Sequence, residues 1–102
     1  MKRKSFTKKE QLTICKKALE ILNEEKYECL CYCIIDAIIA TYGHDSLQFK
    51  IFSNNLELSC IPLLQNKKPK KCQNIYWWNL DEKGYKKRMK ALKDTIKELK
   101  IK

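Results

Sequence analysis

The chain has 102 residues, of which 44% are apolar and 33% are charged, and its formal net charge is +10 at pH 7. A chain of this length forms one domain with a modest core, and its apolar content excludes an intrinsically disordered protein. Two glycines and two prolines are too few for the frequent turns of an all-β fold. We therefore predict a compact all-α bundle of three to four helices, in a single domain over residues 1–102.

The positive charge is concentrated at the two ends of the chain. Residues 1–9 carry a net charge of +5 and residues 67–102 carry +9, whereas residues 10–66 carry −4. Such a distribution is typical of a protein that binds a polyanion or an acidic protein surface.

The first helix is expected over about residues 7–25, after a basic N-terminal tail at 1–6. Thr7-Lys8-Lys9-Glu10 has the pattern of a capping box, in which the side chains of Thr7 and Glu10 bond each other's backbone amides. Phe6 stands just before the cap, where a hydrophobic staple residue is found.

A second helix is expected over about residues 28–42. Its apolar residues point in nearly every direction, which indicates a buried helix around which the other helices pack. The β-branched isoleucines leave a buried strand as the alternative. Gly43 is placed to end the helix in a left-handed conformation.

A short third helix is expected over about residues 46–54, capped by Asp45-Ser46. The alternation of Leu47, Phe49 and Ile51 with polar residues leaves a strand as the alternative.

A long, mobile, lysine-rich loop is then expected over about residues 57–74. Pro62 and Pro69 argue against a regular helix through this segment. Its lysines are Lys67, Lys68, Lys70 and Lys71.

The last helix is expected over about residues 82–100, with Asn79 or Asp81 as its N-cap. Its apolar residues recur every three or four positions, as do the lysines on the opposite side. The predicted core is Leu12, Cys15, Leu19, Leu22, Leu30, Cys33, Ile34, Ile38, Phe52, Met89, Leu92 and Ile96.

The lysines of this last helix are the strongest functional signal in the sequence. Lysines three and four residues apart repel one another, and a merely solvated helix could use glutamates to compensate. The alternative is an ordinary solvated surface in a lysine-rich protein. The candidate binding residues here are Lys86, Lys87, Arg88, Lys90, Lys93 and Lys97, with the four loop lysines beside them.

Both tryptophans, Trp77 and Trp78, lie just before the last helix and are further candidate binding residues. They could stack on single-stranded bases or anchor a protein partner. Alternatively, one or both pack against the second helix and fix the preceding loop to the core.

The six cysteines are interpreted as reduced thiols in a helical core. No pair has the C-x-x-C spacing of a zinc knuckle, and the chain has one histidine, His44. We therefore expect no metal or other cofactor, with an incidental zinc site as the alternative. The longest apolar run, residues 29–40, contains Asp36 and is too short to span a bilayer, so no membrane partner is expected.

We expect no enzymatic activity. The sequence has no nucleophile elbow, no phosphate-binding glycine loop and no carboxylates at metal-ligand spacing.

The order of segments resembles that of short, uncharacterised proteins encoded by bacteriophages and prophages, especially of Bacteroidetes. The resemblance lies in Ala18-Leu19-Glu20-Ile21-Leu22, the cysteine-containing stretch from Cys29 to Ile39, Tyr76-Trp77-Trp78-Asn79-Leu80-Asp81, and the segment from Tyr85 to Leu92. It implies a small phage-type accessory protein in the cytoplasm of a bacterial host. Such proteins commonly bind and block a host enzyme or a defence nucleoprotein such as a CRISPR effector.

Three functional hypotheses follow. The first is a non-enzymatic inhibitor or adaptor that docks on an acidic surface of a nucleic-acid-handling protein or nucleoprotein complex. The second is direct binding to DNA or RNA by the last helix, largely without sequence readout. The third is a minor virion or assembly component.

Overall fold

The computed structural model describes residues 6–24, 30–54, 60–67 and 84–101. In these ranges the regular structure is entirely helical, which confirms the all-α prediction and excludes a strand at 47–54 and over residues 30–42. The helices are α1 (Lys8–Glu24), α2 (Leu30–Tyr42), α3 (Leu47–Asn54), α4 (Pro62–Gln65) and α6 (Gly84–Ile101).

The start of α1 confirms the predicted capping box. The Thr7 amide donates to Glu10 Oε1 at 2.9 Å, and the Glu10 amide donates to Thr7 Oγ1 at 3.1 Å. Phe6, the predicted staple residue, is only 3% exposed. Its carbonyl accepts a hydrogen bond from Gln11 Nε2 at 2.9 Å. Local bonding therefore fixes where α1 begins and directs the preceding residue into the core.

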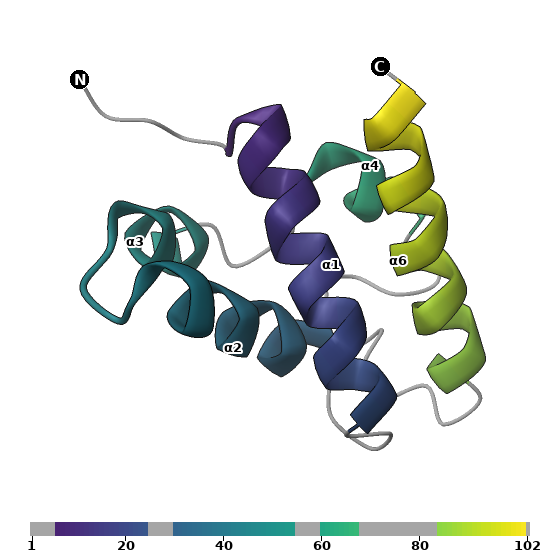
Figure 1. Cartoon of the computed structure of the whole chain (residues 1–102), viewed down its shortest axis with the longest axis horizontal. Helices are drawn as coiled ribbons and strands as arrows, with labels where there is room; N and C mark the ends of the chain where they lie inside the picture. The colour runs from purple at the N-terminus through teal and green to yellow at the C-terminus, as the bar shows by residue number, and fades with distance from the viewer. Residues whose placement is uncertain (1–5, 25–29, 55–59, 68–83, 102) are drawn as a thin grey trace.

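The central helix is α1, which packs against both α2 and α6 (Figure 1). The prediction that the second helix is central is therefore wrong. Ile14 is fully buried and Ile21 packs against the core. These two residues widen the apolar stripe of α1 enough to meet a helix on each side. In contrast, α2 exposes Asp36 and Ala40, which lie four residues apart on one side, so the other helices do not cover it all round.

The turn between α2 and α3 forms as the sequence predicts. Gly43 has φ of 99°, the left-handed conformation that ends a helix, and its amide donates to the Ile39 carbonyl at 3.0 Å. Ser46 Oγ caps α3 by accepting from the Phe49 amide at 3.1 Å, and it donates to the Gly43 carbonyl at 2.7 Å. Ile51 and Phe52 then face the core.

The helix α4 lies where the sequence predicted only loop. Pro62 occupies the first turn of α4, where its fixed φ suits a helix and its missing N–H costs nothing. Cys60, Ile61 and Leu64 are fully buried, so this segment is part of the core. The rest of the predicted loop, apart from 60–67, lies outside the described residues, as does most of the N-terminal tail.

Most of the predicted core residues are buried. Of the predicted set, Cys15, Leu22, Cys33, Ile34, Ile38, Phe52, Leu92 and Ile96 are buried. Leu12, Leu19 and Met89 are half-buried and pack against that core, and the side chain of Leu30 lies outside the description. The buried residues that the prediction missed are Phe6, Ile14, Ala18, Ala37, Ile51, Cys60, Ile61, Leu64, Ala91 and Leu99, together with Arg88 and Thr95.

Candidate anion-binding face

The orientation of α6 is set by the side that it buries. Ala91, Leu92, Ile96 and Leu99 are buried, and α6 packs against α1 and α4. Thr95 is fully buried as well, and its hydroxyl donates to the Ala91 carbonyl at 2.7 Å, so it needs no other partner. The opposite side of the helix is consequently held toward solvent.

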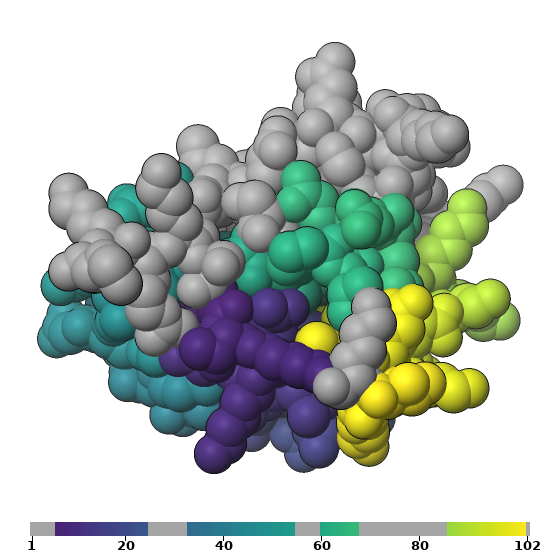
Figure 2. Space-filling model, turned by 90° about the horizontal axis from the view of Figure 1, so that it is seen from above, coloured from purple at the N-terminus to yellow at the C-terminus, as the bar shows by residue number. Residues whose placement is uncertain are grey.

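Lysines dominate that outer side. Five of them lie within a sector of about 80° when successive residues turn by about 100°, and they extend over about 21 Å of helix. We call this set the lysine face: Lys86, Lys90, Lys93, Lys97 and Lys100, all of which are exposed. Extended side chains of α6 project from the edge of the molecule in Figure 2.

Lys87 is exposed, but it lies about 100° around the helix from Lys86 and thus outside the lysine face. Arg88, by contrast, is only 5% exposed. The prediction of Arg88 as a surface binding residue is therefore wrong. Its position follows from helical spacing, because Leu92 and Thr95, four and seven residues later, lie on the buried side.

Two acids border the lysine face, on the side toward α4. Asp94 is half-buried, and Glu98 forms an ion pair with Lys67 from the end of α4, with Nζ and Oε2 2.5 Å apart. Lys67 Nζ also donates to the Leu63 carbonyl at 3.3 Å. Lys67 was predicted as a binding residue, and in the structure its ammonium pairs with a carboxylate beside the face.

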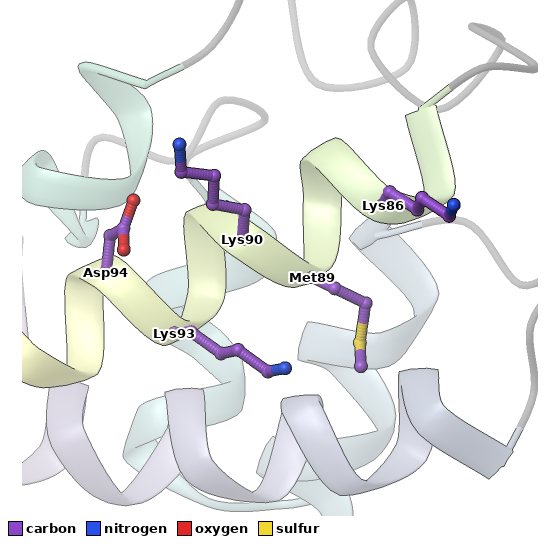
Figure 3. A pocket seen from close by; sticks show the side chains of 5 residues that line it. All are labelled: Lys86, Met89, Lys90, Lys93 and Asp94. Carbon is purple, nitrogen blue, oxygen red and sulfur yellow. The ribbon is translucent and has the colours of Figure 1, made fainter.

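An open hollow of about 370 Å³ lies at the N-terminal part of the lysine face. Met89 is its apolar component, and Lys86, Lys90, Lys93 and Asp94 line it as well. In Figure 3, Met89 and Lys93 extend on the side of α6 nearest α1, whereas Lys90 and Asp94 extend on the other side. The hollow is thus lined by three lysines, one carboxylate and one apolar side chain.

The buried cysteines are poor candidates for chemistry. Cys15 and Cys60 carry free thiols, and Cys33 is buried as well. Burial raises the pKa of Cys15 to about 12, with a smaller contribution from the neighbouring Cys60 thiol, and burial also raises the pKa of Cys60 to about 12. A thiol nucleophile or metal ligand must be deprotonated, so these two groups stay inert at neutral pH.

The described ranges contain no group of three or more histidine, cysteine or acidic side chains placed to hold a metal ion. Within the same ranges, no helix combines the length and the apolar character that a membrane span requires.

Several predicted binding residues lie outside the described residues. They are Trp77, Trp78, Lys68, Lys70 and Lys71. The geometry of the site therefore rests on α6 and on Lys67.

Comparison of the chain with protein-family models, with curated proteins and with solved structures finds no match.

Proposed function

We propose that this chain is a non-enzymatic binding protein whose lysine face holds an extended anionic partner. One observation carries the proposal: each exposed residue of α6 from Lys86 to Lys100 is a lysine. The five lysines of the face form a row parallel to the helix axis, and this row faces away from the core. They form a rigid line of positive charge, which suits a partner whose negative charges are also in a line.

The electrostatics of the free protein support a role in binding. Like charges at i,i+4 spacing destabilise an isolated helix by roughly 0.2–0.5 kcal/mol per pair. Two pairs of the lysine face have this spacing, Lys86 with Lys90 and Lys93 with Lys97. Asp94, four residues after Lys90, offsets only part of the repulsion. An anionic partner relieves the rest, since each lysine then interacts with an opposite charge.

The sequence-based hypotheses all use this face. An inhibitor or adaptor would set it against the acidic surface of a nucleic-acid-handling protein, a nucleic-acid binder would set it against phosphates, and a virion component would set it against packaged DNA. The phage-type setting remains a prediction from the resemblance.

Two charge-reversal variants distinguish binding by the lysine face from binding that depends only on net charge. K90E/K93E changes the centre of the lysine face. K9E/K50E changes two exposed lysines at the start of α1 and on α3, and α3 lies at the opposite end of the molecule from α6 (Figure 1). Both variants have the same formal net charge, four units below the +10 of the parent chain.

The measurement is the salt concentration at which each protein elutes from immobilised heparin, a sulfated polyanion. We expect K90E/K93E to elute at much lower salt than the parent and K9E/K50E to elute close to it. Equal shifts for the two variants would show that overall charge, and not the lysine face, governs binding. Circular dichroism of both variants verifies that the helices are retained.

A further inference from the structure

We infer that the partner of the lysine face is the phosphate backbone of a nucleic-acid duplex, bound without reading of the bases. This inference rests on the proposed function, because it names the partner of the same surface. It depends on three features of α6: the length and straightness of the line of charge, the kind of cation that it presents, and the side chains missing from it.

The lysine face is a straight line of charge, and a duplex offers more than one phosphate for each of its lysines over the same length. It extends over about 21 Å at about 1.5 Å per residue. A DNA duplex carries one negative charge per about 1.7 Å of its axis, so on the order of twelve phosphates lie within that length. The α6 helix and the duplex are both rigid rods, so neither backbone has to lose conformational freedom for the charges to meet. A flexible single strand would lose conformational freedom on aligning with the same face.

The face presents point charges and none of the planar groups that read base edges. Base readout in the major groove uses paired hydrogen bonds, which arginine, asparagine and glutamine form with fixed geometry, whereas lysine contacts guanine alone. The one arginine of α6, Arg88, is 5% exposed and lies on the buried side. The exposed residues from 86 to 101 are six lysines and Ile101. A lysine ammonium binds a phosphate as a compact charge and carries little geometric specificity.

The described part of the face also lacks the groups that other anionic partners need. Proteins that bind single strands stack the bases on aromatic side chains, and no aromatic residue is exposed on α6 between residues 86 and 101. Stable protein partners are anchored by buried aromatic or arginine side chains near the centre of the contact. Here Met89 is half-buried at one margin of the face, and Ile101, 75% exposed, lies beyond its last lysine.

Fluorescence anisotropy with labelled oligonucleotides tests the inference. The probes are mixed-sequence 20-base-pair duplexes of DNA and of RNA, the corresponding single strands, and polyglutamate as a competitor, each over a range of salt concentrations. We expect at least one duplex to bind more tightly than its single strand, with little dependence on sequence. The slope of log K against log[salt] on DNA duplex should be about −4 to −5, because five lysines each replace about 0.9 counterion. The relative affinity for the two duplexes indicates which backbone geometry fits better.

The two variants connect this test to the proposed function. K90E/K93E should reduce the magnitude of the slope by about 2, because two phosphate contacts are lost, whereas K9E/K50E should leave the slope unchanged. Single strands that bind as tightly as duplexes, or polyglutamate that displaces duplex at equal charge concentration, would overturn the inference. In either case the proposed function survives if heparin elution still depends on Lys90 and Lys93. If heparin elution does not depend on them, both proposals fail.

Discussion

The ion pair between Lys67 and Glu98 makes a prediction that distinguishes direct binding from charge compensation. Lys67 Nζ lies 2.5 Å from Glu98 Oε2, and the two side chains are 23% and 45% exposed. The K67M substitution removes the ammonium group but keeps an unbranched apolar side chain of similar length. Glu98 then remains as an uncompensated carboxylate at the border of the lysine face.

The expected effects on duplex affinity are small, and they are opposite in sign for substitutions of Lys67 and of Glu98. A carboxylate on the order of 10 Å from a phosphate repels it by about 0.4 kcal/mol in a water-like dielectric, which is about twofold in affinity. K67M should therefore weaken duplex binding about twofold, and E98Q should strengthen it by a similar factor. Because the pair is partly exposed, K67M should cost no more than about 1 kcal/mol of stability.

The double variant K67M/E98Q decides between the two roles of Lys67. If Lys67 acts by neutralising Glu98, the double variant binds as tightly as the parent and keeps its salt slope. Anisotropy at low and near-physiological salt measures both quantities, and urea unfolding verifies that each variant remains folded. A double variant that binds more weakly than the parent, with a slope smaller by about 1, would refute this reasoning and place Lys67 on a phosphate.

Three further predictions concern the fold. T7A should lower the free energy of unfolding by about 1 kcal/mol in urea, since the capping bond to the Glu10 amide is lost. G43A should cost about 1–2 kcal/mol in the same assay, because φ is +99° there and no atom within 4 Å would compensate through new contact. Cys15 and Cys60 should react with iodoacetamide at pH 8 far more slowly in the folded protein than in urea, by peptide mapping. Their pKa of about 12 in the folded state lies above the ordinary value of 9.0, so unfolding releases protons above pH 9 and stability should fall there by up to about 1.4 kcal/mol per pH unit per thiol. Rapid alkylation of the folded protein, or stability that is flat above pH 9, would contradict the burial of these thiols.

The features that the sequence predicted correctly are those decided by neighbouring residues. The capping box at Thr7, the left-handed Gly43 and the cap at Ser46 each depend on hydrogen bonds within a few positions. The direction of the lysine face follows in the same way from helical periodicity, because the apolar residues of α6 fix which side is buried.

The features that the sequence did not reveal depend on distant contacts. The helix α4 is one turn long, so its stability comes from burying residues such as Leu64, and no local periodicity announces it. Lys67 is separated from Glu98 by 31 positions, and a pairing of that kind depends on how α4 packs against α6. The wrong prediction for Arg88 has a different origin. Its charged neighbours in the sequence suggest an exposed residue, but its position around the helix places it on the buried side.

The surface of α1 in the same chain differs from the lysine face in its balance of charge. The exposed residues of α1 are three lysines, two glutamates and one asparagine: Lys8, Lys9, Lys16, Glu20, Glu24 and Asn23. Lys17 and Glu20 also form an ion pair at 3.6 Å, so α1 balances its charges locally.

A bias of the whole protein toward lysine would act equally on both helices. However, the residues that α6 exposes from 86 to 100 are all lysines, its two acids are only partly exposed at the border of the face, and Lys67 neutralises one of them. The incomplete compensation is therefore a property of this one surface and not of the composition. A surface that retains mutual repulsion among its lysines, on a helix that is otherwise well packed, supports our proposal of an anionic partner that removes the repulsion on binding.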